Sequence, residues 1–218
     1  MPEHARDRIL ARLRRAPREA QPPDDAATPQ APAPGGGAAA ALEAALAAMR
    51  AEVQRLPREG WAGELRERLR GRGLSSLLYA RGTPWAPALE EAWAAGPEGP
   101  PVLAAWEGTV EEFRDRLFAA DAAITRAEAA AADPGVLVLR PGPAEPRLLS
   151  LVPPVHVVLV PGERIFGTLE EALAGGGFAP PLPANLVLVS GPSKTADIEL
   201  TLAFGVHGPR ELLVFILE

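Results

Sequence analysis

The stretch from Leu186 to Arg210 holds the residues whose types and spacing most clearly suggest chemistry. It contains Gly-Pro-Ser-Lys-Thr at 191–195, and Lys194 is the one lysine of the chain. An apolar run precedes this segment, so the pattern predicts a strand, a tight turn and a helix that starts near Thr195. Backbone N–H groups at such a helix start favour an anion, Lys194 adds a positive charge, and the Ser193 and Thr195 hydroxyls add donors. The alternative is that a hydroxyl only caps the helix and Lys194 is solvated.

Three other polar side chains lie close to this turn in the sequence. His207 stands in Gly-Val-His-Gly-Pro at 205–209, where an imidazole can act as an acid or base or can simply hydrogen-bond its own turn. Asp197 and Glu199 are two residues apart, so on a helix they point to different faces and do not form a carboxylate pair. Asp197 suits the first helical turn, and Glu199 is equally consistent with ligand contact and with exposure. By contrast, His156 lies inside an apolar run and is expected to be a core histidine.

Familiar catalytic and nucleotide-binding motifs are absent from this stretch. A P-loop requires glycine before the lysine and another five residues earlier, where this chain has Ser193 and Leu188. The serine-hydrolase pattern Gly-x-Ser-x-Gly fails because Thr195 stands at its last position. Gly71-Arg-Gly73 follows a predicted helix and does not continue as a dinucleotide fingerprint.

Composition narrows the classes of protein that fit. The 218 residues are 47% hydrophobic and carry a formal net charge of -6, which argues against a nucleic-acid-binding domain. The chain has no cysteine, which excludes disulfides, cysteine-ligated zinc and an iron–sulfur cluster held by the chain itself. With three histidines, a metal site is not expected either. No apolar run approaches the roughly 20 residues of a membrane span, and no secretory signal is evident. We therefore expect a soluble cytoplasmic protein.

Composition also divides the chain into three parts. Residues 1–16 predict a basic amphipathic helical arm, which could bind a membrane or an acidic partner, or pack on its own core or on a second copy. Residues 17–38 are rich in proline and glycine and predict a linker. Residues 39–218 are expected to form one α/β domain.

Within that domain, the spacing of apolar residues and the positions of glycine and proline predict helices that alternate with strands. Thr109 with Glu112, and Thr168 with Glu171, have the spacing of capping boxes that open helices. The alternation predicts a mixed, mostly parallel sheet with helices on both faces, and short connections between 136 and 160 favour antiparallel pairs there. Helices are expected at 42–56, 61–69, 83–93 and 109–118 and after 168, and strands at 74–80, 101–106, 122–125, 136–139, 148–151, 155–160, 186–190 and 211–217.

Two segments, 191–199 and 205–210, resemble the lactate-utilisation protein C family of LUD-domain proteins, with support from 147–156 and 8–13. The resemblance implies a fold similar to that of glucosamine-phosphate and ribose-phosphate isomerases and CoA-transferases. It also implies a role in oxidising L-lactate to pyruvate beside two iron–sulfur partner proteins. Iron–sulfur clusters are then expected only on these partners, with no cofactor on this chain. A small anionic metabolite and a second copy of the chain are the other expected partners.

One segment departs from the family pattern. The family usually has Ala-Asp/Glu-Thr-Gly-Thr/Ser before the strand at 136, whereas this chain has Ala-Asp-Pro-Gly-Val at 132–136. Asp133 and Gly135 are kept and both hydroxyls are lost, which implies weakened, altered or absent catalysis. Two alternatives therefore stay open: a stand-alone enzyme acting on a phosphorylated or CoA-linked molecule, and a non-catalytic ligand-binding or regulatory module. The candidate catalytic residues are His207, Asp133 and Glu199. The candidate ligand-binding residues are Gly191, Ser193, Lys194, Thr195, Asp197, Gly135 and Gly208.

Overall fold

The computed structural model describes residues 36–178, 183–196, 202–204 and 207–218. The predicted helical arm at 1–16 and nearly all of the predicted linker lie outside the described residues. Among the residues that are described, no helix combines the length and the apolar character needed to cross a bilayer.

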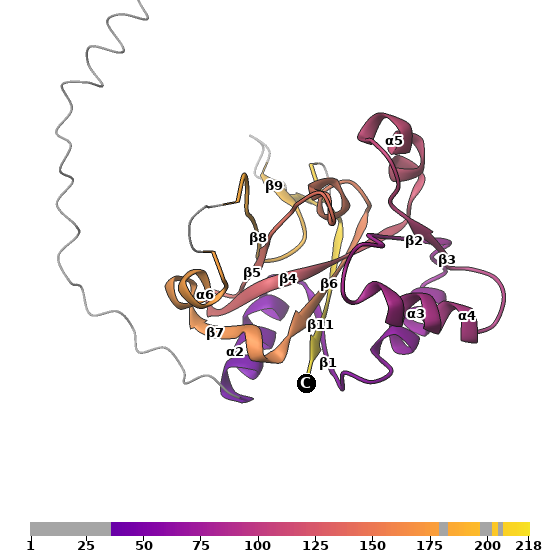
Figure 1. Cartoon of the computed structure of the whole chain (residues 1–218). Coiled ribbons are helices and arrows are strands. Elements are labelled where there is room, and N and C mark those ends of the chain that lie inside the picture. The colour runs from indigo at the N-terminus through magenta and orange to yellow at the C-terminus, as the bar shows by residue number, and fades with distance from the viewer. Residues whose placement is uncertain (1–35, 179–182, 197–201, 205–206) are drawn as a thin grey trace, which may run out of the picture. The chain divides into compact units, whose positions relative to one another are not determined.

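Six parallel strands form the main part of the sheet (Figure 1). Every neighbouring pair in this part is parallel, which confirms the predicted, mostly parallel sheet. In spatial order the strands are β1 (Glu52–Leu56), β11 (Glu211–Leu217), β6 (Val155–Pro161), β4 (Ala122–Asp133), β2 (Ser76–Tyr79) and β3 (Val102–Ala105).

The second half of β4 continues into a smaller, mixed part of the sheet. It pairs antiparallel with β5 (Val136–Leu139) and parallel with β7 (Ile165–Thr168). β8 (Val187–Val189) adds to the outer side of β5 in antiparallel orientation. The prediction of antiparallel pairs between 136 and 160 is therefore confirmed for β5 and wrong for β6, which is parallel to both β4 and β11. A separate ribbon joins β9 (Lys194–Ala196) to β10 (Leu202–Phe204).

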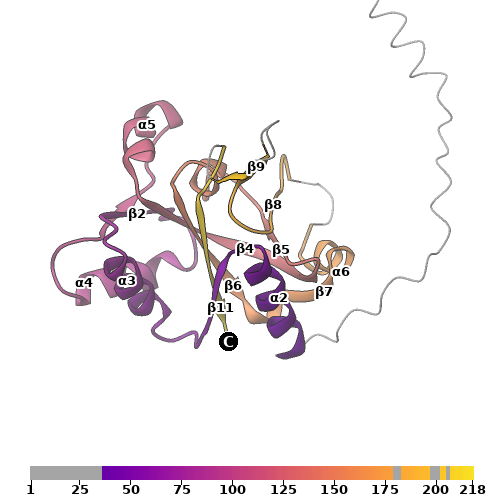
Figure 2. The same ribbon diagram turned by 180° about the vertical axis from the view of Figure 1, so that it is seen from behind.

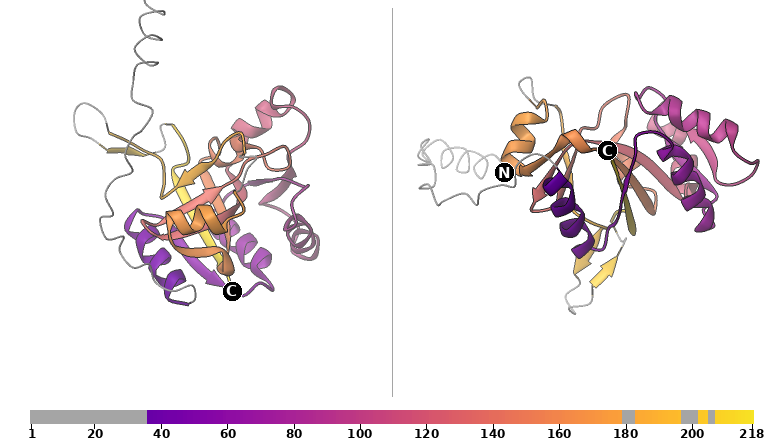
Figure 3. Two further views of the ribbon diagram at one scale, coloured as in Figure 1. Left: turned by 60° about the vertical axis from the view of Figure 1, so that its left-hand side comes forward. Right: turned by 90° about the horizontal axis from the view of Figure 1, so that it is seen from below.

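Helices cover both faces of the parallel strands. On one face, α3 (Trp61–Gly71) and α4 (Ala86–Ala95) pack against the sheet through the hydrophobic cluster that contains Leu77 and Phe215. The opposite face packs α2 (Gly36–Ala48) through the cluster that contains Ile216. In Figure 3 the right-hand view, from below, separates α2 from the α3–α4 pair across the sheet. Two further helices are α5 (Val110–Ala119) and α6 (Leu169–Gly175), and two 3₁₀ turns are η1 (Arg147–Ser150) and η2 (Gly162–Arg164).

Both predicted capping boxes are present. The Thr109 hydroxyl accepts from the Glu112 N–H at 3.4 Å, and the Glu112 carboxylate accepts from the Thr109 N–H at 2.8 Å. The Thr168 hydroxyl accepts from the Glu171 N–H, and the Glu171 carboxylate accepts from the Thr168 N–H, both at 3.2 Å. Each box therefore fixes the first turn of its helix, α5 or α6, as the sequence predicts.

The helix predicted over 42–56 is wrong in its second half. α2 ends at Ala48, Arg50 adopts a left-handed backbone with φ of 69°, and β1 follows. The residues after Arg50 form a parallel ladder with β11, with Val53 opposite Val214. A left-handed residue ends the helix, and pairing with a buried strand then satisfies the backbone groups that a longer helix would have bonded internally.

Two other predicted elements are also corrected. The Thr83 hydroxyl donates to the Ala80 carbonyl at 2.7 Å and does not cap the helix, which begins three residues later at Ala86. The strand predicted at 148–151 is instead η1, in which the Ser150 hydroxyl donates to the Arg147 carbonyl at 2.8 Å. In both places a side-chain hydroxyl bonds to a carbonyl three residues back and stabilises a turn.

Candidate functional site

The predicted anion-binding turn lies on a strand and not at the start of a helix. Lys194 opens β9 and pairs with Phe204 of β10, so the helix predicted near Thr195 is wrong. The ladder with β10 occupies backbone groups that the prediction assigned to an anion, and β-branched Thr195 suits a strand. Asp197 and Glu199 lie outside the described residues. The helix component of the anion site is therefore lost, and Lys194 with the turn itself is what is left.

Strand pairing brings the two candidate segments together. β5 and β8 are antiparallel with Leu137 opposite Val189, a register that sets the 133–135 turn beside the loop after β8. Both segments rest on the last turns of α2. A Cβ on Gly135 would lie 2.6 Å from the Ala45 Cβ, and one on Gly191 would lie 2.8 Å from the Met49 carbonyl oxygen. Ala45 lies in the last turn of α2 and Met49 follows its last residue, so the C-terminal end of α2 supports both segments.

The turn that contains His207 joins the same cluster through the backbone. The Ser193 N–H donates to the Pro209 carbonyl at 2.8 Å, and a Cβ on Gly208 would lie 3.1 Å from the Ser193 Cβ. The Arg210 N–H donates to the Pro154 carbonyl at 2.7 Å. We call residues 133–135, 190–194 and 207–210 the loop cluster. In Figures 1 and 2, β9 lies at the end of β11 that is opposite the C-terminal residue.

The polar side chains of the loop cluster face solvent. Lys194 is exposed, with its Nζ 3.9 Å from the Met49 sulfur, and no ion pair joins it to a residue that the structure describes. His207 is exposed, and so is Asp133 at the end of β4. No hydrogen bond or ion pair in the described part of the chain links Asp133, His207 and Lys194. What the cluster offers chemically is two exposed cations, Lys194 and Arg210, above a backbone held by glycine contacts.

The third histidine has the predicted core position. His156 is 1% exposed, and its Nε2 lies 2.8 Å from the Thr125 hydroxyl. Burial lowers the pKa of His156 to about 3, which leaves the imidazole neutral near pH 7. The core prediction for His156 is therefore confirmed.

A carboxyl group that sequence reasoning missed has the opposite shift. Burial raises the pKa of Glu145 to about 7, although its Oε1 accepts from the Arg126 N–H at 3.1 Å. A hydrogen bond from the Trp85 side chain and the charge of Arg126 lower this pKa, and the charge of Glu128 raises it. Glu145 stands between two prolines in an ordinary turn sequence, so only its packing against β4 distinguishes it.

The strongest comparison is with a domain family. A family model described as the LUD domain matches residues 39–217, from α2 to the last residue of β11. The chain belongs to the LUD-domain family. The matched region of this LUD domain includes the whole loop cluster and Glu145.

Individual relatives agree with this assignment. An uncharacterized protein of Neisseria meningitidis serogroup B is 36% identical over 173 residues, which cover 78% of this chain and 73% of that protein. Lactate utilization protein C of an Exiguobacterium species is 32% identical over 149 residues, covering 66% of this chain and 60% of the relative. The protein of the same name from Bacillus subtilis is 32% identical, covering 51% and 48%. This LUD domain thus spans about half of the length of these lactate utilization proteins.

A solved structure shares the fold. The crystal structure of a DUF162 family protein from Deinococcus radiodurans has a TM-score of 0.56 and 20% sequence identity, covering 84% of this chain and 97% of the other. At that identity the likeness concerns the fold alone.

Proposed function

We propose that this LUD domain is a component of an L-lactate utilisation system and binds a small anionic ligand at the loop cluster. The observation that carries the proposal is the match to the LUD domain together with relatives named lactate utilization protein C. The redox chemistry of lactate oxidation is assigned to iron–sulfur partner proteins, because a chain without cysteine cannot ligate such a cluster through its own thiolates.

The geometry of the loop cluster supports the ligand part of the proposal. Lys194 is an exposed cation without an ion-pair partner among the described residues, so it is available to an anion from solvent. The backbone beneath it is fixed at two places: Gly191 against Met49, and Ser193 against Pro209. A cation on a fixed backbone selects for negative charge with little reorganisation.

Growth on L-lactate tests the proposal. A strain that lacks the gene should fail to grow on L-lactate while growing normally on pyruvate, and the wild-type gene should restore growth. Lys194→Gln should restore growth poorly, whereas Arg140→Gln, which removes an exposed charge outside the loop cluster, should restore it fully. Tagged protein from lactate-grown cells should co-purify with an iron–sulfur protein. Normal growth of the deletion strain on L-lactate, with no iron–sulfur protein recovered, would reject the proposal.

A further inference from the structure

A cavity of about 270 Å³ lies at the carboxyl ends of the parallel strands. The register aligns Leu56, Leu217 and Pro161 in one row, and the latter two line the cavity. Arg126 reaches it from β4, where it pairs with Leu159. In open α/β sheets ligands bind beyond the carboxyl ends of strands, so this is the position where the architecture favours a site.

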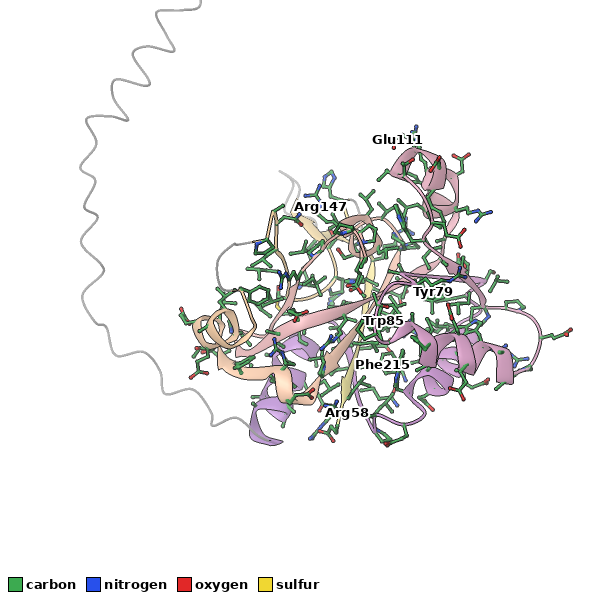
Figure 4. All side chains as sticks on the ribbon, in the orientation of Figure 1. Arg58, Tyr79, Trp85, Glu111, Arg147 and Phe215 are labelled. Carbon is green, nitrogen blue, oxygen red and sulfur yellow. The ribbon has the colours of Figure 1, made fainter. Side chains whose placement is uncertain are left out.

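The cavity has an aromatic wall and a charged rim. Trp61 and Trp85 are 5% and 8% exposed, and each begins or caps a helix that covers the sheet, α3 or α4. At the rim Arg58 forms an ion pair with Glu163, and their side chains are 52% and 55% exposed. Figure 4 shows Arg58 near the C-terminal end of β11 and labels Trp85 nearer the centre of the view, beyond Phe215.

Arg126 is the lining cation that forms no close ion pair in the described part of the chain, although its charge acts on Glu145 and Glu163. It is half-buried, and no ion pair within 4.0 Å joins its guanidinium to any residue in the described part of the chain. Its backbone N–H is the group that bonds Glu145. A half-buried guanidinium beside a cavity with tryptophan walls is a recognition site for a planar anion, because the fork of N–H groups matches a carboxylate.

We propose that this cavity binds a small organic carboxylate, with Arg126 pairing its charge and Trp61 and Trp85 contacting its apolar part. A single charge is favoured over a phosphate ester, because the charged lining residues Arg58, Arg126 and Glu163 carry a net charge of only +1, and Glu163 pairs with Arg58. The cavity volume is close to the lower end of ligand pockets, about 300 Å³, which limits the ligand to roughly one ring in size.

This site is separate from the loop cluster. β11 follows Arg210 of the loop cluster directly and ends at Leu217 in the cavity wall, so the two sites lie about 23 Å apart along the strand. The proposal therefore does not depend on the lactate function. Failure of carboxylate binding in the cavity would leave the growth and co-purification results unchanged.

The neighbourhood of Arg126 makes binding sensitive to pH. The charged groups that act on Glu145 are Arg126 and Glu128 of β4, and burial keeps the pKa of Glu145 at about 7. An ionised Glu145 partly neutralises Arg126, so a bound carboxylate should favour protonated Glu145. Benzoate affinity should then weaken as the pH rises through about 7, and Glu145→Gln should flatten this dependence.

The site is tested by titrating the full-length protein with benzoate while binding is monitored by calorimetry and by tryptophan fluorescence. Saturable binding of benzoate is expected, with weaker binding of phenyl phosphate and no binding of the neutral isostere benzamide. Arg126→Gln should weaken benzoate binding at least tenfold, whereas Arg140→Gln should leave it unchanged. Equal affinity for benzoate and benzamide, or equal losses in the two variants, would overturn the proposal.

A second variant keeps the test decisive if Arg126→Gln unfolds the protein. Glu163→Gln alters an exposed side chain, removes the negative charge at the rim and frees Arg58. Benzoate should bind this variant severalfold more tightly than the wild type. Unchanged or weaker binding would contradict the assignment of this cavity to an anion.

Discussion

The Thr125 hydroxyl lies 2.8 Å from the His156 Nε2 across the β4–β6 strand pair. Both side chains are buried, at 2% and 1% exposure, and Thr125 stands opposite Val158, two residues along β6 from His156. This diagonal placement lets one hydroxyl satisfy a ring nitrogen that water cannot reach. Because burial lowers the pKa of His156 to about 3, the sheet holds the imidazole in its neutral form.

The first prediction follows from that neutral imidazole. Below the usual histidine pKa of about 6.5, His156 is protonated in the unfolded chain and neutral in the folded protein. The free energy of unfolding therefore falls by about 1.4 kcal/mol for each unit by which the pH is lowered, down to about pH 3. His156→Gln keeps a hydrogen-bonding side chain and removes this titration. Urea unfolding should show the variant gaining on the wild type by about that slope as the pH falls from about 6.5 to 5. Parallel stability curves for the two proteins would contradict the assignment.

The second prediction concerns Glu145 and has the opposite sign. The pKa of Glu145 in the folded protein, about 7, lies above the ordinary glutamate pKa of 4.5. Between these two pH values the Glu145 carboxyl is protonated in the folded protein and ionised in the unfolded chain. The stabilisation is therefore present below about pH 4.5 and is lost as the pH rises through about 7. Glu145→Gln should gain on the wild type by about 1.4 kcal/mol per unit as the pH rises in this window.

In the wild type the two slopes offset one another between about pH 4.5 and 6.5. Each single variant should therefore expose the other group: stability should rise with pH in Glu145→Gln and fall with pH in His156→Gln. Glu98→Gln, at an exposed position, is the control and should follow the wild type. A Glu145→Gln curve that also follows the wild type would show that the Glu145 carboxyl is not held protonated.

Elements with local determinants were predictable from the sequence. The two capping boxes and the strands at 136–139 and 211–217 agree with the structure because each is defined by its own residues. The 42–56 helix fails because its apolar spacing persists after the helix ends. Nothing local to Val53 shows that it will pair with β11, a strand that lies about 160 residues later.

The same reasoning applies to the candidate site. The 191–195 and 205–210 segments could be singled out by residue type, and family resemblance added 132–136. Their meeting on α2 depends on β5–β8 pairing, which local sequence does not encode. Arg126 and Glu145 gave no signal, because the burial of Glu145 and the position of Arg126 beside a cavity exist only in the assembled sheet.

The third prediction tests the packing of the 133–135 turn on α2. Gly135 has φ of 83°, and a Cβ there would lie 2.6 Å from the Ala45 Cβ, closer than nonbonded carbons approach. Gly73 has a similar φ of 69°, and a Cβ there would meet no atom within 4 Å. A substitution at Gly73 therefore measures the cost of the left-handed backbone alone. Gly73→Ala should reduce the free energy of unfolding by about 1 kcal/mol, and Gly135→Ala by about 3 kcal/mol, in urea titrations.

A rescue variant separates overlap from backbone strain. Ala45→Gly removes the opposing Cβ, so adding it to Gly135→Ala should recover part of the lost stability. Equal costs for the Gly135 and Gly73 substitutions would place the turn away from α2.

The fourth prediction tests whether the two halves of the loop cluster touch. A Cβ on Gly208 would lie 3.1 Å from the Ser193 Cβ and 3.2 Å from its hydroxyl oxygen, which is tight but not impossible. Gly208→Ala should therefore lower the free energy of unfolding by about 1 kcal/mol through overpacking.

A double-mutant cycle assigns this cost to one contact. Ser193→Gly removes both opposing atoms, so Gly208→Ala should cost less in that background, with a coupling energy of about 0.5 to 1 kcal/mol. The cycle is measured by urea unfolding, and Gly177→Ala, whose added Cβ would meet nothing within 4 Å, should show no coupling to Ser193→Gly. Additive effects of Gly208→Ala and Ser193→Gly would mean that the 207–210 turn does not pack on Ser193. The backbone beneath Lys194 would then lack the support on which its proposed anion binding depends.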